Sequence, residues 1–307
     1  MGVAHPAKKM TVYEELVRRQ LPNGGWGYFR STQPSVEVTC LMALALGSTD
    51  GSTVSPQAIA VTSLLRWQNP DGSWPAFPGD TEGSWVTSLA LTVLNALGDG
   101  SGASDLASRW ILETRGRESY WPWRWKFKVA DRSVGLDPGK FGWPWMPGTN
   151  SWVIPTAFSV VAIKQFTACR TSDLLERRIR TGVDMLLDRA CAGGGWNAGN
   201  SIVYGVPLEP HVEPTAIALL AFQDEPRGAV VQQSLNWLRK RATDLRSISS
   251  LATAILVLFL YQDRIQELKE RLSALVGDGV SIRNNATLAM ATLALKCGEA
   301  VHPFAII

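Results

Sequence analysis

The sequence has little of what metal sites, disulfides and membrane spans require. Its 307 residues include four cysteines and three histidines, and no two cysteines stand at a C-x-x-C spacing. We therefore expect reduced, mostly buried thiols and no metal site. The longest apolar run, residues 251–261, is far shorter than the roughly 20 residues that cross a bilayer. Residues 1–10 are polar, unlike a signal peptide, so we expect a cytoplasmic protein.

Charge is also sparse, because charged residues make up 19% of the chain and the net charge is +3. So small a charge gives no indication of nucleic-acid binding. The basic runs at 177–178 and 239–241 fit solvated helix faces. Hydrophobic residues make up 46%, which is typical of a globular chain with a sizeable core.

A repeated segment is the most informative feature of the chain. In five places a small polar residue, usually threonine, opens a run of Leu, Ala, Val and Ile: residues 37–44, 85–91, 154–158, 213–220 and 286–290, with a sixth run near 250–260. These runs are apolar on nearly all sides, which predicts buried helices. Amphipathic segments precede them at residues 13–20, 56–68, 105–114, 177–188, 229–241 and 264–275.

Six outer and six inner helices predict an all-α fold. An open row would need polar capping repeats at its ends, and the sequence shows no such repeat, so we expect the pairs to close into an α6/α6 toroid. We expect residues 1–307 to form a single toroid domain with a Trp-rich loop insertion at about 115–152 near one rim.

Gly-Trp loops join the outer and inner segments in three units, at residues 23–27, 71–74 and 193–197. Asn-Gly and Asp-Gly are turn signals, and we expect Trp26, Trp74 and Trp196 to pack these loops rather than contact substrate. Two units share the pattern Gln, three residues, Gly, one residue, Trp, which runs from Gln20 to Trp26 and from Gln68 to Trp74.

This pattern resembles the C-terminal half of the QW repeat of squalene–hopene and oxidosqualene cyclases, a family of terpene cyclases. In that family the Gln and Trp side chains brace the outer helices against each other. The resemblance covers most of the chain and is weakest after about residue 225. It implies a hydrophobic, isoprenoid substrate and a proton-initiated reaction that needs no cofactor. Peripheral membrane contact, a homodimer or a partner that supplies a second domain all stay open.

Squalene–hopene cyclases use the central Asp of an Asp-x-Asp-Asp-Thr motif as proton donor. In register with Thr39, Glu37 falls on the proton donor's position, while Ser35 and Val38 replace the flanking Asp residues. The resemblance therefore implies an acid at Glu37 but not the complete motif.

The same register at Thr215 places Glu213 on the central position, two residues from His211. We take Glu37 and Glu213 as the two candidate catalytic residues. Related toroids fit less well, because neither the zinc set of protein prenyltransferases nor that of lanthionine cyclases is visible.

Inner helices that begin at one end of a ring bring their first residues together at its mouth. On this alignment the mouth carries Glu37, Trp85, Ile154, Glu213 and either Asn284 or Asn285. A carboxyl group among Trp side chains has a raised pKa, and its neutral form can protonate an alkene or epoxide. Aromatic faces then stabilise a carbocation. A carboxylate in the first helical turn is also favourable without any catalytic role.

Residues 115–152 hold six of the 13 Trp residues of the chain. A long ordered loop of this kind predicts either an aromatic lid that binds an apolar ligand or a clip that fills a gap. The candidate substrate-binding residues are Trp85, Trp121, Trp123, Trp143, Trp145, Trp152 and His211. Arg124, Lys126, Lys128 and Arg132 can meet a diphosphate or a lipid headgroup, or stay solvated.

Three functions are compatible with these features. The first is a terpene cyclase-like enzyme, and the second is a non-catalytic toroid that binds a lipid, a prenyl chain or a protein. The absence of the motif Asp residues and of a second toroid favours the non-catalytic toroid. The third is a carbohydrate-active toroid with Glu37 and Glu213 as acid and base.

Overall fold

A computed structural model describes residues 11–30, 33–47, 55–98, 102–130, 135–168, 172–226 and 228–306. Six buried helices form an inner layer: α2 (Val36–Leu46), α4 (Val86–Leu97), α7 (Val153–Thr167), α9 (Val212–Leu220), α11 (Ile248–Leu260) and α13 (Asn285–Leu295). The outer layer consists of α1 (Val12–Arg18), α3 (Pro56–Arg66), α5 (Ala103–Glu113), α8 (Asp173–Asp188), α10 (Ala229–Ala242) and α12 (Gln266–Val276). The all-α prediction is confirmed.

Two insertions interrupt this alternation. Between α5 and α7 lie η1 (Arg117–Ser119), α6 (Trp121–Trp125) and the π-helical turn η2 (Lys126–Ala130). Between α8 and α9 lies a short antiparallel hairpin of β1 (Ile202–Val203) and β2 (Val206–Pro207).

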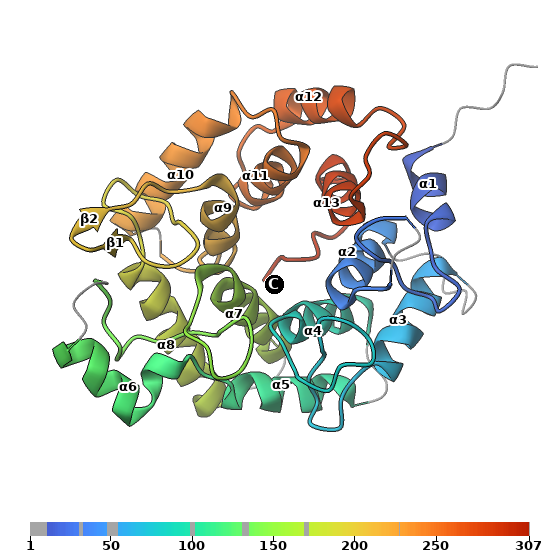
Figure 1. The fold of residues 1–307 in the computed structure, drawn as a ribbon. Helices are drawn as coiled ribbons and strands as arrows, with labels where there is room; N and C mark the ends of the chain where they lie inside the picture. The colour runs from blue at the N-terminus through green and yellow to red at the C-terminus, as the bar shows by residue number, and fades with distance from the viewer. Residues whose placement is uncertain are drawn as a thin grey trace, which may run out of the picture.

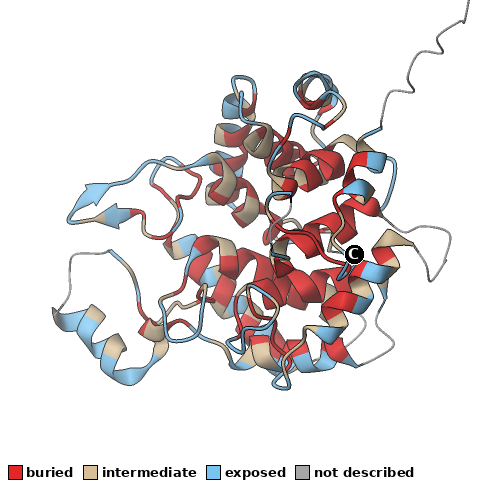
Figure 2. Cartoon of the chain, turned by 45° about the vertical axis from the view of Figure 1, so that its right-hand side comes forward, coloured by how far each residue is buried: buried red, intermediate tan, exposed pale blue. Residues whose placement is uncertain are grey.

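The inner helices form a closed ring. Each packs against the next along the chain, and α13 packs against α2 (Figure 1). Outer helices lie over the seams, as α3 does between α2 and α4 and α12 does between α11 and α13. The burial pattern in Figure 2 follows from this arrangement, because the inner layer is almost entirely buried. The predicted ring of six helical pairs is therefore confirmed.

Burial of the two layers matches their sequences. Ten of the eleven residues of α2 are buried, so a helix that is apolar all round can exist only inside the ring. In the outer helix α8, by contrast, burial follows one stripe that includes Leu175, Arg178, Gly182 and Met185. Spacings of three and four residues place that stripe on one side of the helix.

Four units share one set of contacts, which we call the Trp–Thr clamp. The backbone N–H of Trp26 donates to Oγ1 of Thr39 at 3.0 Å, and its indole N–H donates to the carbonyl of Leu16 in α1 at 2.9 Å. The same pair of bonds recurs in Trp74–Thr87, Trp143–Thr156 and Trp196–Thr215. All four indoles are buried, which confirms the packing role predicted for Trp26, Trp74 and Trp196.

Trp143 forms a fourth Trp–Thr clamp that was not expected from the sequence. We expected it to line a ligand pocket, but its indole is buried and donates to the carbonyl of Ile111 at 2.7 Å. The guanidinium of Arg178 covers its ring at 3.5 Å from the centroid. Trp143 and Thr156 are 13 residues apart, as are the partners in the first two clamps. A Cβ on Gly142 would lie 2.0 Å from Oγ1 of Thr156, which explains the glycine before this Trp.

The two glutamines of the repeated pattern join neighbouring units. The amide of Gln20 donates to the carbonyl of Pro56, the first residue of α3, at 2.9 Å. Gln68 makes the same bond, at 3.0 Å, to Ala103, the first residue of α5. Each glutamine therefore ties the end of one outer helix to the start of the next.

Polar contacts close the ring between its first and last units. The fully buried Glu15 of α1 pairs with Arg19, whose guanidinium donates to the carbonyl of Ile282 at 2.7 Å and to Oδ1 of Asn285 at 2.8 Å. The Asn285 amide in turn donates to the carbonyl of Gly27 at 2.7 Å. Residues more than 250 positions apart are thereby held together.

Candidate functional site

The first turns of all six inner helices surround one cavity of about 350 Å³, near the lower end of the usual size of ligand pockets. Each helix start includes a pair of lining residues four positions apart, which lie on the same face one turn from each other. The pairs are Glu37 and Leu41, Trp85 and Leu89, Ile154 and Phe158, Glu213 and Ile217, Ser249 and Thr253, and Ala286 and Met290. We call this cavity the mouth pocket.

Glu37 is a carboxyl group of the mouth pocket whose pKa is raised. It lies in the first turn of α2, where the rest of the helix is buried. Burial raises the pKa of Glu37 above its ordinary value of 4.5, and a hydrogen bond from Tyr28 opposes that rise. The hydroxyl of Tyr28 donates to Oε2 of Glu37, and burial together with the neighbouring carboxylate raises the pKa of Tyr28. Glu37 can therefore hold a proton at a higher pH than an exposed glutamate.

Glu213 lies on the opposite side of the ring. Three steps separate α2 from α9 in either direction around the inner layer, so the two carboxyl groups enter the mouth pocket from opposite walls. Oε1 of Glu213 accepts from the hydroxyl of Ser249 at 2.8 Å and from that of Ser250 at 3.5 Å. These bonds hold the Glu213 carboxyl group in place beside the start of α11.

Aromatic rings form one wall and the floor of the mouth pocket. The rings of Trp85 and Trp145 meet edge to face at 5.1 Å between centroids, and Trp85 lies 5.7 Å from Phe158. Phe158 in turn rests on the buried ring of Phe304, also at 5.7 Å. The backbone N–H of Trp85 donates to the carbonyl of Trp145 at 3.0 Å. This bond holds the loop that carries Trp145 against the start of α4.

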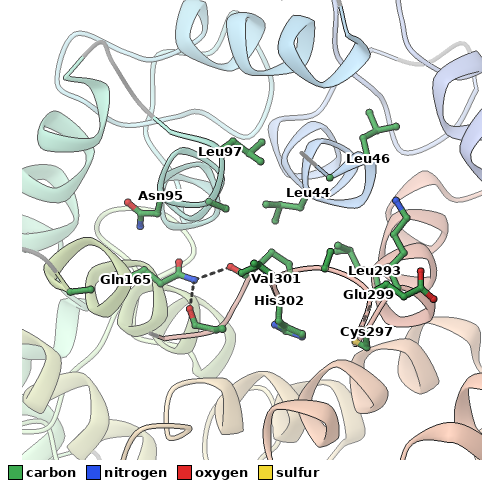
Figure 3. Close-up of a pocket in the computed structure, with 17 residues that line it drawn as sticks. Leu44, Leu46, Asn95, Leu97, Gln165, Leu293, Cys297, Glu299, Val301 and His302 are labelled. Carbon is green, nitrogen blue, oxygen red and sulfur yellow. Dashed lines mark hydrogen bonds between the residues drawn. The ribbon is translucent and has the colours of Figure 1, made fainter. Parts of the chain in front are cut away.

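The opposite end of the ring is occupied by the last described segment of the chain, residues 300–306, which lies at the ring centre in Figure 1. Figure 3 shows this segment beside a second cavity of about 680 Å³, lined by the last turns of α2, α4, α7 and α13. The amide of Gln165 donates to the carbonyls of Pro303 and Ala305 at 2.8 and 2.9 Å. Gln223 donates to the carbonyl of Phe304 at 2.8 Å and accepts from the N–H of Ile306.

His302 continues the aromatic column below Phe304. Its ring lies 6.0 Å from Phe304 and 6.0 Å from Phe259. Burial lowers the pKa of His302 to about 4, and Nδ1 accepts a hydrogen bond from the N–H of Phe304. This imidazole is therefore neutral, and the centre of the ring is closed beneath the mouth pocket.

The three cysteines in the described part of the chain are Cys40, Cys191 and Cys297, and all are free and buried. This confirms the expectation for these thiols, whereas Cys169 and His5 lie outside the described residues. Burial raises the pKa of Cys297 to about 12, so its thiol stays protonated.

Four predicted site residues meet in the mouth pocket, namely Glu37, Glu213, Trp85 and Trp145. The structure places the others elsewhere. Trp152 precedes α7 and packs against Gly199, and His211 is an exposed residue that precedes α9.

Trp121 and Trp123 also lie outside the mouth pocket, in α6 at the outer edge of the ring (Figure 1). Of the six Trp residues in the insertion, Trp145 alone lines the mouth pocket. Arg132 lies outside the described residues.

Two kinds of lining residue were missed from the sequence. Phe158, Leu41 and Ile217 stand four residues after a predicted mouth residue, so helical spacing alone would have identified them. Tyr28 lies in the loop between Trp26 and Thr39 of the first Trp–Thr clamp, and Ser249 belongs to the unit whose register was uncertain. No local pattern marks either residue. Of the two asparagines considered, Asn284 lines the pocket, whereas Asn285 closes the ring.

Within the described ranges, no three His, Cys, Asp or Glu side chains lie close enough together to hold a metal ion. No helix built from those residues is both long and apolar enough to cross a membrane.

Comparisons with known proteins support the all-helical fold and show a similarity in sequence over part of the chain. No protein-family model matches the chain. Enfumafungin synthase efuA of Hormonema carpetanum is 29% identical over 120 residues, which cover 36% of this chain and 9% of that protein. The chain is thus similar to a small part of this much longer enzyme.

Solved structures share the architecture at low identity. A protein from Actinoplanes is 13% identical, with a TM-score of 0.60 over 94% of this chain and 98% of that one. The native conformation of E. coli alpha-2-macroglobulin is 11% identical, with a TM-score of 0.50 over 96% of this chain and 17% of that one. These similarities show an all-helical fold.

Proposed function

We propose that the protein is a terpene cyclase-like enzyme that protonates an isoprenoid substrate in the mouth pocket. The observation that carries the proposal is Glu37, a carboxyl group with a raised pKa that faces an aromatic wall and a second carboxyl group in one cavity. The local similarity to enfumafungin synthase and the QW-like glutamines support the same class of chemistry.

Glu37 is the proposed acid. In its neutral form it transfers its proton to one carbon of a substrate double bond, and the other carbon becomes a carbocation. The resulting carboxylate keeps the hydrogen bond from the Tyr28 hydroxyl, which stabilises the charge that develops on Glu37. Tyr28 is therefore a positioning residue rather than a proton donor, because its own pKa is raised.

The aromatic wall and Glu213 serve the later steps. Faces of Trp85, Trp145 and Phe158 stabilise the cation by about 0.5–2 kcal/mol each while a second double bond attacks it and forms a ring. The Glu213 carboxylate, held by Ser249, then accepts a proton from a carbon next to the final cation, which restores a double bond. The overall reaction is an isomerisation without any oxidant or cofactor.

Turnover in D₂O tests the proposal directly. The purified chain is incubated with farnesol, farnesyl diphosphate or squalene, and the products are analysed by gas chromatography and mass spectrometry. We expect a cyclic isomer that has gained one deuterium, and we expect Glu37→Gln to lower its rate by about 10²–10⁴-fold. The exposed Glu267→Gln on α12 is the matched control and should leave the rate unchanged.

Full turnover in the Glu37→Gln, Glu213→Gln double variant would reject this mechanism. A substrate recovered unchanged but tightly bound would instead support a non-catalytic prenyl-binding ring. That alternative draws on the replacement of two motif Asp residues by Ser35 and Val38.

A further inference from the structure

Two projections stand out from the ring on one side, and neither contributes to the mouth pocket. The first is the aromatic–basic arm, residues 120–129, which includes α6 and most of η2. The second is the β1–β2 hairpin. Figures 1 and 2 show both at the same side of the molecule, and Figure 2 shows that both are largely exposed.

The arm exposes large apolar side chains at a regular spacing. Trp121, Trp125 and Val129 are four residues apart and are 79%, 59% and 54% exposed. Tyr120 precedes them and is 51% exposed. Apolar groups of this size are normally buried in a monomeric protein, and Trp121 is among the most exposed of the large hydrophobic side chains here.

Positive charge accompanies these rings. Residues 115–129 contain five basic side chains and one acid, Glu118. Glu118 is buried and accepts from the backbone N–H of Ser151, so it does not face solvent with the bases. Arg117 and Lys126 lie over the ring of Trp123, at 4.3 and 5.0 Å from its centroid. The exposed surface of the arm is therefore cationic as well as aromatic.

The hairpin extends this surface. Tyr204 at its tip is 82% exposed, and Val206 beside it is 59% exposed. Gly135 lies in the segment that follows the arm, and its backbone N–H donates to the carbonyl of Ile202 in β1 at 3.2 Å. The arm and the hairpin are thus linked, and both belong to loops that lead into inner helices at the end where the mouth pocket opens.

We propose that the arm and the hairpin dock the protein onto the surface of a bilayer that contains anionic phospholipids. Trp and Tyr rings are favoured at the boundary between headgroups and acyl chains, where their apolar bodies and polar edges are both accommodated. Arg and Lys beside them attract anionic headgroups. Two convex projections with rings at their tips suit a planar surface, whereas a protein partner would have to supply a separate groove for each.

Co-sedimentation of the full chain with vesicles tests the proposal. We expect binding to phosphatidylcholine vesicles with about 20% phosphatidylserine, and binding at least about tenfold weaker to phosphatidylcholine alone or at high salt. Trp121→Ser with Trp125→Ser, and separately Lys126→Glu with Lys128→Glu, should each weaken binding by about tenfold or more. All four side chains are exposed, so these variants should retain the wild-type circular dichroism spectrum.

Matched controls come from surfaces away from the arm. Val301→Ser alters a side chain that is also 79% exposed, at the opposite end of the ring. Lys240→Glu with Arg264→Glu reverses two exposed charges near α10 and α12. Loss of binding in the controls to the same extent, equal binding to both kinds of vesicle, or no binding by the wild type would each overturn the proposal. The last result would favour a protein partner for the arm, and none of these outcomes depends on catalysis in the mouth pocket.

Discussion

The two ends of the ring consist of the same six helices, but they differ in what fills them. At the mouth, side chains from the first helical turns line an open pocket with two carboxyl groups and an aromatic wall. At the opposite end, residues 300–306 occupy the centre, and Gln165 and Gln223 bind their backbone. An aromatic column from Trp85 to His302 separates the ends.

This difference indicates how a ring of buried helices can carry a polar site. Inner helices need uncharged residues on almost every side, and their charged side chains, such as Glu37 and Glu213, lie near the helix ends. The mouth keeps the two carboxyl groups accessible, whereas residues 300–306, which we call the tail, occupy the ring centre beside the second cavity and pack under the aromatic column. This division of roles predicts that changes at the tail affect stability, whereas changes at the mouth affect chemistry more than stability.

Removal of the Phe304 ring should have the largest effect on stability. Phe304 is buried between Phe158 and His302, so Phe304→Ala leaves a cavity in the column and should lower the free energy of unfolding by about 3–5 kcal/mol. Chemical denaturation measures this change. Val301→Ala, three residues away and exposed, should change stability by less than about 0.5 kcal/mol. Equal effects of the two variants would show that the tail does not pack as described.

The second effect is a loss of stability at the tail in acid. Burial lowers the pKa of His302 from 6.5 to about 4, so the unfolded chain binds a proton in this range and the folded chain does not. The free energy of unfolding should fall by about 3 kcal/mol between pH 6.5 and pH 4 because of this group. His302→Phe keeps an aromatic ring and should remove this part of the pH dependence. Identical pH profiles for the two proteins would contradict the assignment.

A smaller effect is expected when the glutamines that bind the tail are shortened. Gln165→Ala and Gln223→Ala each leave tail carbonyls without their donors and should cost about 1–3 kcal/mol. Hydrogen exchange at the N–H of Ile306, which donates to Gln223, should speed up in Gln223→Ala. Gln232→Ala on the exposed face of α10 is the control, and it should leave this exchange rate unchanged.

Much of the ring follows from the sequence because its signals are local. Inner and outer helices differ in apolar periodicity, and a mouth residue such as Glu37 or Glu213 is marked by the threonine two positions later. Trp143 is an exception, because its Trp–Thr clamp lies in a Trp-rich insertion and was not recognised there. Its spacing of 13 residues to Thr156 was present in the sequence, but the density of tryptophans nearby favoured a lid.

Contacts between distant segments were not predictable. The tail reaches Gln165 from 138 positions away, and nothing in residues 300–306 indicates that they enter the ring. The hydrogen bond between Tyr28 and Glu37 also depends on a contact between distant segments. The loop that carries Tyr28 is held in place by Asn285, whose backbone N–H donates to the carbonyl of Tyr28. Local patterns therefore located the Glu37 carboxyl group, whereas its surroundings could be known only from the complete fold.

The smallest expected effect on stability lies at the mouth, and its sign is opposite to that at the tail. Because burial raises the pKa of Glu37 above 4.5, the folded chain keeps a proton that the unfolded chain loses as pH rises. Relative to Glu37→Gln, the wild type should lose stability as pH increases from 4.5 through the folded pKa. Tyr28→Phe removes the hydrogen bond that lowers this pKa, so the carboxyl resonance of Glu37 in ¹³C NMR should titrate at higher pH. A lower pKa in Tyr28→Phe would show that Tyr28 stabilises the neutral acid instead, and its assigned role in positioning the carboxylate would then be wrong.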